Sequence, residues 1–158
     1  EEVESFGEFA KRNNAVASTD VKSFEHLICT EQLSRRLGFK VGEELIRVVR
    51  VRSLNGSARQ VDHGYFLASI AKGLTPEIAA DSIYGYLEHK CGVKVMASRR
   101  TVSVELANDE DCSYLDLGKY NCVAVMESQS YTSDGILFEV THARTHPEIF
   151  HYRVNSKR

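Results

Sequence analysis

The stretch Leu45-Ile46-Arg47-Val48-Val49-Arg50-Val51-Arg52-Ser53-Leu54-Asn55-Gly56 decides the fold of this chain. Its Val and Ile residues, which favour extended backbone, predict a strand over residues 44–54. Asn55-Gly56 then favours a tight turn, so we expect a second strand at about 59–67 that runs antiparallel to the first. An antiparallel hairpin is therefore the predicted centre of the fold.

Outward from this hairpin, short helices alternate with further strands. Thr30 is expected to cap a helix over 31–37, and Ser82 is expected to cap a helix over 83–90. We expect an α+β fold, in which helices pack on a mostly antiparallel sheet of about six strands. The other predicted elements are strands at about 19–29, 93–106, 121–131, 136–145 and 149–153, and helices at 6–14 (opened by a Ser5/Glu8 capping box), from Thr75-Pro76 onward and at 108–117.

Length and composition predict one domain over residues 1–158, with 42% hydrophobic and 27% charged residues. The net charge is −2, whereas a free-standing nucleic-acid-binding domain is usually strongly basic. No apolar run reaches the length of about 18 residues that a membrane helix needs, and the acidic start predicts no signal peptide. The four cysteines form no CxxC pair, so we expect reduced thiols and a cytoplasmic protein. Because the chain does not begin with Met, we expect it to be part of a longer protein.

Sequence signatures of catalysis are missing. The chain has no GxSxG, HExxH, Walker or GxGxxG motif. His142, His146 and His151 lie on predicted strand and loop, where their spacing does not create one ligand face, so we expect no metal site. These absences favour a binding domain without a cofactor over an enzyme.

Two arginines inside the apolar strand are the most informative polar feature. Arg50 and Arg52 are two residues apart and therefore point to the same face of the strand. Two guanidinium groups side by side repel each other unless an anion lies between them, and a phosphate or carboxylate suits their geometry. The commoner explanation is an exposed strand face, or pairing with Asp or Glu across the sheet.

Other residues are compatible with the same kind of ligand. Ser82 opens a predicted helix, where backbone N–H groups favour an anion, although simple capping is the commoner use. Arg99 and Arg100 alternate faces along one predicted strand, so at most one of them points to a given site.

Acidic residues lie near the arginines in the predicted sheet. Asp62 is expected across the hairpin from the arginine strand, and Glu139 shares a strand with Arg144. Each carboxylate has two interpretations. It forms a structural ion pair, or it accepts hydrogen bonds from sugar hydroxyls while the arginines hold a phosphate. Together these residues predict an anion-binding site in an α+β domain.

The order of these motifs resembles the UTRA domain, the effector-binding domain of HutC-type GntR transcription regulators. The resemblance covers nearly the whole chain. It implies a chorismate lyase-like fold, a homodimer and an N-terminal winged-helix domain, absent from this chain, that contacts operator DNA. The matching pieces are Ser5-Phe6, Leu37-Gly38, Val41-Gly42-Glu43, Arg50-x-Arg52, Asn55-Gly56, Asp62-x-x-Tyr65-Phe66, Gly73-Leu74, residues 81–88, residues 134–139, Arg144 and Phe150.

Within this family, residues 65–67, 73–79, 82–88 and 114–118 are most similar to the branch that responds to trehalose 6-phosphate. The resemblance therefore implies a repressor domain whose inducer is a phosphorylated sugar. The implied phosphate-binding residues are Arg50, Arg52, Ser82, Tyr84 and Arg99, with Arg100 as the alternative to Arg99. The implied sugar-binding residues are Asp62, Glu139 and Arg144.

One position departs from the pattern, because Thr145 stands where relatives carry a tyrosine that stacks on the sugar. This departure favours a different sugar from theirs. The alternatives are a sensor of another sugar phosphate such as N-acetylglucosamine 6-phosphate, a sensor of a carboxylate such as urocanate, a chorismate lyase-like enzyme, and a structural dimerisation module.

Overall fold

The computed structural model of the chain describes residues 6–152. Ser5, the predicted cap of the first helix, lies outside these residues. The strands are β1 (Ala17–Ile28), β2 (Glu44–Leu54), β3 (Ser57–Leu67), β4 (Val95–Leu106), β5 (Cys122–Thr132) and β6 (Leu137–Thr145), and the helices are α1 (Phe6–Arg12), α2 (Glu31–Leu37), α3 (Pro76–Ala79), α4 (Ile83–His89) and α5 (Asp109–Tyr114).

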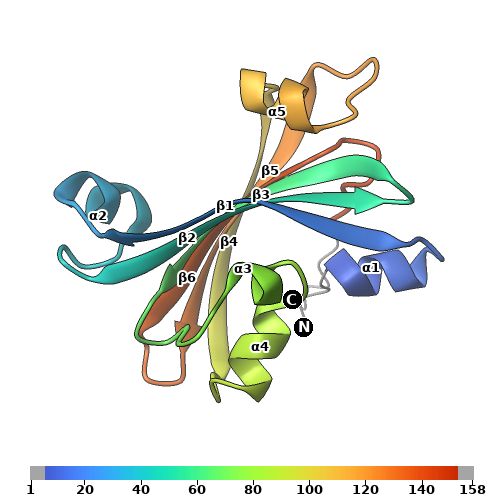
Figure 1. Ribbon diagram of the computed structural model, residues 1–158. Helices are drawn as coiled ribbons and strands as arrows, with labels where there is room; N and C mark the ends of the chain where they lie inside the picture. Colours follow the sequence, from blue (N-terminus) through green and yellow to red (C-terminus); the bar gives the residue numbers. More distant parts are fainter. Residues whose placement is uncertain (1–5, 153–158) are drawn as a thin grey trace, which may run out of the picture.

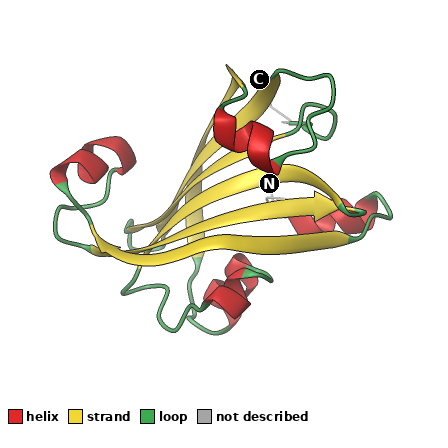
Figure 2. Cartoon of the chain, turned by 45° about the horizontal axis from the view of Figure 1, so that its top comes forward, coloured by secondary structure: helices red, strands yellow, loops and turns green. Residues whose placement is uncertain are grey.

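The strands form one antiparallel sheet in the order β1-β2-β3-β6-β5-β4. Helices lie on both faces of this twisted sheet: α2 and α5 above it, and α1, α3 and α4 below it in the view of Figure 1. Figure 2 shows the same arrangement after a rotation. The predicted α+β fold with an antiparallel sheet of about six strands is confirmed. Within residues 6–152, no helix is both long and apolar enough to cross a membrane.

The hairpin between β2 and β3 turns where the sequence predicts. Asn55 and Gly56 have φ angles of 50° and 79°, and this left-handed backbone at both turn residues matches the right-handed twist of the flanking strands. The register shifts once, between Arg52 and Ser53, and beyond this irregularity Arg50 lies directly opposite Asp62.

The predicted helix caps are present at α2 and α4. The Thr30 hydroxyl accepts a hydrogen bond from the Leu33 N–H at 3.2 Å, and Gly38 ends α2 in the left-handed conformation at φ 93°. The Ser82 hydroxyl accepts from the Gly85 N–H at 3.0 Å. These caps fix where α2 and α4 begin relative to the sheet.

Two apolar cores hold the helices against the sheet. In the larger core, Leu37 of α2 and Leu87 of α4 pack with strand residues such as Phe66. In the smaller core, the segment after α5 packs on β2, β3 and β5. The helix predicted over 108–117 ends at Tyr114, because Leu115 adopts an extended backbone and, with Leu117, buries its side chain in this second core.

The prediction of a strand over residues 149–153 is wrong for residues 149–152, which the structure describes. Residues 147–149 form a turn and residues 150–152 are irregular. Pro147 has no N–H to donate to a ladder, and the Ile149 N–H donates back to the His146 carbonyl at 3.2 Å. The chain therefore turns away from the sheet after β6.

Candidate functional site

Arg50 and Arg52 converge on one carboxylate. Arg50 Nη2 lies 3.1 Å from Asp62 Oδ2, and Arg52 Nη1 lies 3.5 Å from the same oxygen. All three side chains are largely buried: 11% of the Arg50 side chain, 15% of Arg52 and 4% of Asp62 is exposed. Asp62 is thus the anion between two guanidinium groups that the sequence pattern required. The cluster retains one net positive charge.

The two arginines differ in their remaining contacts. Arg50 Nη1 donates to the Ala79 carbonyl of α3 at 3.3 Å. The guanidinium of Arg52 stacks on the Phe6 ring, with 4.6 Å between its Cζ atom and the ring centroid, and Arg52 Nε is buried without a hydrogen-bond partner. Burial lowers the pKa of Arg52, and the nearby charge of Asp62 opposes this shift.

Polar side chains from β3 and β6 extend this cluster along the sheet. Gln60 Nε2 donates to Asp62 Oδ1 at 2.6 Å, and the Thr145 hydroxyl donates to Gln60 Oε1 at 3.1 Å. Gln60 and Thr145 are directly opposed across β3 and β6. Thr145 stands at the position where the family resemblance implies a tyrosine. It therefore belongs to the same hydrogen-bonded group as Asp62.

A second buried acid lies on the same face. Tyr84 of α4 donates its O–H to Glu139 Oε2, and its oxygen lies 2.9 Å from the Ser130 hydroxyl. The Thr141 hydroxyl donates to Glu139 Oε1 at 2.7 Å. Burial raises the pKa of Glu139, and the hydrogen bonds from Tyr84 and Thr141 oppose that shift. Burial, reinforced by the charge of Glu139, raises the pKa of Tyr84.

Strand register connects these groups into one surface. Asp62 faces Ala143 across β3 and β6, and Ala143, Thr141 and Glu139 alternate onto the same side of β6. The charge of Arg50 also acts on Glu139. We call this surface the polar face. It consists of Arg50, Arg52, Gln60, Asp62, Arg100, Ser128, Ser130, Glu139, Thr141 and Thr145 from the sheet, with Tyr84 from α4.

The register also distinguishes Arg100 from Arg99. Arg100 is opposite Ser128, which is opposite Thr141, so Arg100 lies on the polar face. Its charge acts on Tyr84, and its Nε atom is buried without a hydrogen-bond partner. Arg99 is opposite Gln129 and points to the other side of the sheet. The structure thus brings together Arg50, Arg52 and Tyr84 with Arg100, and places Arg99 apart from them.

Ser82 and Arg144 have structural partners. The Ser82 hydroxyl caps α4, as described above. Arg144 faces Val61 and lies on the opposite side of β6 from Glu139. There its Nε and Nη2 atoms donate to Asp111 at 2.9 and 2.8 Å, and its Nη1 atom donates to Glu105 at 2.5 Å. These contacts raise the pKa of Arg144, and they anchor α5 on the sheet instead of contributing to the polar face.

Sequence reasoning missed the neutral members of the polar face. Gln60 is two residues from Asp62, and Thr141 is two residues from Glu139, so period-2 alternation contained the signal for both. Ser128 and Ser130 carried no such signal, because their face is defined only by pairing of β5 with β6. Hydroxyl and amide groups of this kind suit the hydroxyls of a sugar.

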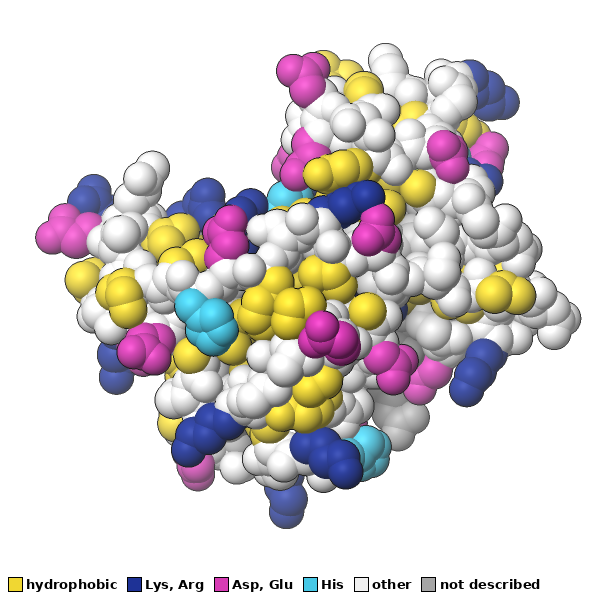
Figure 3. Space-filling model, viewed as in Figure 1, with side chains coloured by type: hydrophobic (Ala, Val, Ile, Leu, Met, Phe, Trp, Pro, Cys, Tyr) yellow, Lys and Arg dark blue, Asp and Glu magenta, His cyan; other side chains and the backbone are white. Residues whose placement is uncertain are grey.

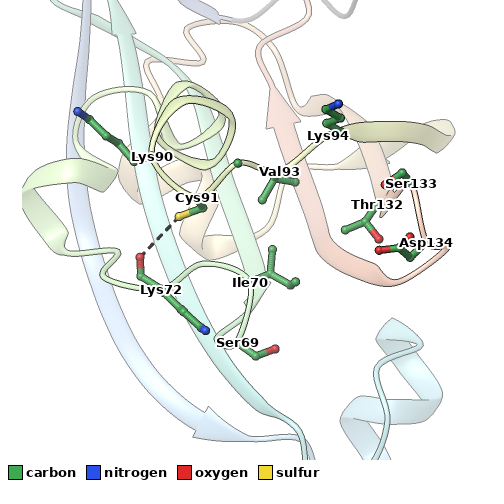
Figure 4. A pocket seen from close by; sticks show the side chains of 11 residues that line it. Ser69, Ile70, Lys72, Lys90, Cys91, Val93, Lys94, Thr132, Ser133 and Asp134 are labelled. Atoms are coloured by element: carbon green, nitrogen blue, oxygen red, sulfur yellow. Dashed lines mark hydrogen bonds between the residues drawn. The ribbon is translucent and has the colours of Figure 1, made fainter.

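Two cavities of about 450 Å³ lie elsewhere in the described part of the chain. One lies among residues 69–72, 90–94 and 132–134 (Figure 4). There Cys91 Sγ donates to the Lys72 carbonyl at 3.6 Å, and Lys90 points away from Ile70 and Val93 (Figure 4). Neither cavity is lined by a predicted site residue. The candidate site is therefore the polar face, which holds the predicted residues Arg50, Asp62 and Glu139.

The remaining titratable groups are dispersed. His146 is buried and accepts from the Glu148 N–H at 3.1 Å, while His142 lies 3.7 Å from Glu127 on the side of the sheet away from the polar face. Among residues 6–152, no three His, Cys, Asp or Glu side chains are grouped to hold a metal ion. Acidic and basic side chains are interspersed over the face of the molecule that Figure 3 shows. This mixed surface agrees with the net charge of −2 and differs from a nucleic-acid-binding face.

Solved structures with this fold include effector-binding domains of transcription regulators. The effector-binding domain of the trehalose repressor TreR from Bacillus subtilis is 27% identical and superposes with a TM-score of 0.81 over 89% of this chain and 98% of that one. PhnF from Mycobacterium smegmatis superposes with a TM-score of 0.87 over 99% of this chain and 69% of that one, at 18% identity, which shows a shared fold.

Residues 12–151 match the family model of the UTRA domain. The chain therefore belongs to the UTRA domain family. Among curated relatives, the transcriptional regulator TreR from B. subtilis is 28% identical over 148 residues, and the regulator YydK from the same organism is 31% identical over 88 residues. These alignments cover 94% and 56% of this chain, and 62% and 37% of the relatives. The chain thus spans less than two thirds of the length of either relative.

Proposed function

We propose that this domain is a sensor, without enzymatic activity, that binds a phosphorylated sugar on the polar face, and that trehalose 6-phosphate is the first ligand to test. The observation that carries the proposal is the arginine arrangement. Arg50 and Arg52 share a single carboxylate, and the buried Nε atoms of Arg52 and Arg100 have no hydrogen-bond partner. Buried guanidinium donors without partners are costly, and a phosphate would satisfy them through charge-assisted hydrogen bonds.

The sugar end of the ligand is assigned to the neighbouring hydroxyl and carboxyl groups. Glu139, Tyr84 and Thr141 form a hydrogen-bonded set on the same face, and such a set can exchange its internal hydrogen bonds for bonds to sugar hydroxyls. Asp62 acts mainly as the counter-ion of the arginine pair, and its contact with Gln60 leaves little accepting capacity for a sugar. Arg144 is excluded from this assignment by its position on the opposite side of the sheet.

The proposed context is a cytoplasmic repressor that acts as a homodimer. The whole protein would contact operator DNA through an N-terminal domain, and the sugar phosphate would act as inducer. A ligand changes DNA binding only if its affinity differs between two dimer arrangements, typically by about 1–3 kcal/mol. The TreR name of a relative and the trehalose repressor structure support this context and this ligand.

A thermal-shift panel tests the ligand. Trehalose 6-phosphate, trehalose, glucose 6-phosphate, N-acetylglucosamine 6-phosphate and urocanate are compared at equal concentrations. A ligand at 100 times its Kd stabilises the folded state by about 2.7 kcal/mol, which corresponds to a rise of roughly 5–11 °C in Tm for a domain of this size. No rise with any phosphorylated sugar overturns the proposal, and equal rises with trehalose and its phosphate overturn the phosphate role of the arginines.

Two neighbouring arginines provide a matched pair of variants. Arg100→Ala removes a guanidinium from the polar face, whereas Arg99→Ala removes one from the other side of the same strand. We expect Arg100→Ala and Arg50→Ala to weaken binding of the sugar phosphate but not of trehalose, and Arg99→Ala to leave both unchanged. An equal effect of Arg99→Ala and Arg100→Ala contradicts the assignment to the polar face. Binding without turnover also predicts no 4-hydroxybenzoate after incubation with chorismate, and its formation would identify an enzyme.

A further inference from the structure

The cavity shown in Figure 4 has no part in the proposed function. Three segments far apart in the sequence line it: residues 69–72 after β3, residues 90–94 between α4 and β4, and residues 132–134 at the β5–β6 turn. Its volume of about 450 Å³ lies within the range of about 300–1,000 Å³ that is usual for small-molecule sites. We call it the lysine cavity, because Lys72, Lys90 and Lys94 are among the residues that line it.

One wall of the lysine cavity is held in place by α4. The Tyr86 hydroxyl donates to the Lys72 carbonyl at 2.6 Å, and Cys91 Sγ donates to the same oxygen at 3.6 Å. Gly73 has a φ angle of 76°, and a Cβ atom at this residue would lie 2.8 Å from the Tyr86 hydroxyl oxygen. The close approach of the loop to α4 therefore requires glycine. The loop that carries Lys72 is thus fixed in position without a ligand.

The charges around the lysine cavity are mostly positive. Three lysines and one acid, Asp134, line it, which gives a net charge of +2 from three positive groups and one negative group. The whole chain, in contrast, has a net charge of −2. Within residues 6–152, none of these four side chains forms an ion pair. Charges of one sign that line a concave surface attract ligands of the opposite sign.

The neighbouring cavity lacks this excess of positive charge. It shares Ser69 and Lys72 with the lysine cavity, but Glu43 and Glu44 also line it. Two acids thus accompany a single lysine there. Because like charges repel, an anion is expected in the lysine cavity and not in its neighbour.

We propose that the lysine cavity binds a small oxyanion with at least two negative charges and one hydroxyl group, such as a hydroxylated polycarboxylate or a phosphorylated polyol. Lys72 and Lys94 come from two different walls (Figure 4) and each supplies a charged donor for an acid group of the ligand. Lys90 points away from the apolar side chains in Figure 4 and adds only its charge.

The uncharged part of the ligand is assigned from the remaining side chains. Asp134 has only acceptor atoms when ionised, so it needs a hydroxyl donor on the ligand. Thr132 lies beside Asp134 in Figure 4, and its hydroxyl also suits a ligand hydroxyl. Ile70 and Val93 lie across from these two residues (Figure 4) and provide an apolar wall for the carbon atoms of the ligand.

Two-dimensional amide NMR spectra recorded during titrations locate the site. Citrate and glycerol 3-phosphate are the probes, and sodium chloride at matched ionic strength controls for screening. We expect saturable shifts of the amide signals of Gly92, Lys94 and Ser133, which line the cavity. The probe with the lower dissociation constant identifies the acid group that the site prefers. The proposal is overturned if neither probe shifts these signals saturably.

Lysine variants test the charged contacts. Each exposed charge contact typically contributes a factor of up to about five in affinity, so we expect the double variant Lys72→Ala/Lys94→Ala to raise the dissociation constant about tenfold. Lys11→Ala is the matched control, because Lys11 is an exposed lysine on α1. Circular dichroism confirms that each variant is folded. A loss of affinity in Lys11→Ala equal to that in the double variant overturns the proposal.

The Arg50→Ala variant separates this site from the polar face. No residue of the polar face lines the lysine cavity, so Arg50→Ala should keep the shifts of Gly92 and Ser133. Loss of these shifts in Arg50→Ala overturns the second site. The inference does not depend on the proposed function, because the thermal-shift panel tests the polar face independently.

Tricarballylate, which is citrate without its hydroxyl group, tests the role of Asp134. We expect the parent chain to bind citrate more tightly than tricarballylate, because only citrate can donate a hydroxyl hydrogen bond to this carboxylate. Asp134→Ala should bind the two acids equally. Equal affinity of the parent chain for both acids, or a preference for citrate that persists in Asp134→Ala, overturns the proposed class of ligand.

Discussion

Asp62→Asn separates the structural role of the arginine pair from its capacity to bind an anion. The substitution keeps the size of the side chain and removes the negative charge from between Arg50 and Arg52. Breaking a buried ion pair by removing one partner typically costs about 3–5 kcal/mol. The asparagine oxygen still accepts one hydrogen bond, and the arginine side chains are 11% and 15% exposed. We therefore expect a loss of stability at the lower end of this range, about 3 kcal/mol.

Thermal unfolding followed by circular dichroism measures this loss. For a domain of this size about 3 kcal/mol lowers Tm by roughly 6–12 °C. Asp20→Asn is the matched control, because Asp20 is an exposed acid paired with Lys22, and exposed ion pairs contribute at most about 1 kcal/mol.

Inorganic phosphate then tests the anion site. Phosphate should raise the Tm of Asp62→Asn more than that of the parent chain, because the two guanidinium groups then carry positive charges that no carboxylate compensates. Chloride at matched ionic strength controls for screening. The reasoning is refuted if Asp62→Asn melts at the same temperature as the parent, or if phosphate stabilises both chains equally.

Three further substitutions probe the rest of the molecule. Burial raises the pKa of Glu139 above its ordinary value of 4.5, so above pH 4.5 the folded chain binds more protons than the unfolded chain, and the free energy of unfolding falls as the pH rises towards the raised pKa. Urea unfolding at several pH values should show that Glu139→Gln lacks this fall. Parallel stability curves for the variant and the parent chain would contradict the expectation. Asp111→Ala leaves the buried guanidinium of Arg144 without its main partner, which should lower the free energy of unfolding in urea by about 3–5 kcal/mol. The affinity for a sugar phosphate should stay unchanged. A loss of affinity without a loss of stability would indicate that Arg144 contacts the ligand. Leu87→Ala empties a fully buried position in the larger core and should cost about 2–5 kcal/mol, whereas a cost below about 1 kcal/mol would mean that α4 does not anchor the polar face.

The sequence by itself determined the local elements and the relative directions of close neighbours. Asn55-Gly56 specified the hairpin turn, because few residues tolerate a positive φ. Thr30 and Ser82 specified where α2 and α4 begin, since their hydroxyls satisfy backbone N–H groups that have no partner inside the helix. Period-2 alternation placed Arg50 and Arg52 on one side of a strand.

Only the tertiary structure decided which of these sides come together. Whether Arg99 or Arg100 joins Arg50 depends on the register through four strand pairings, β2-β3-β6-β5-β4, and a slip of one residue in any pairing would exchange the two arginines. Likewise Tyr84 reaches Glu139, 55 residues away, because α4 packs on the sheet through its apolar side chains. Alternation specifies sides within a strand, but contacts distant in sequence are fixed by the pairing and packing of the whole sheet.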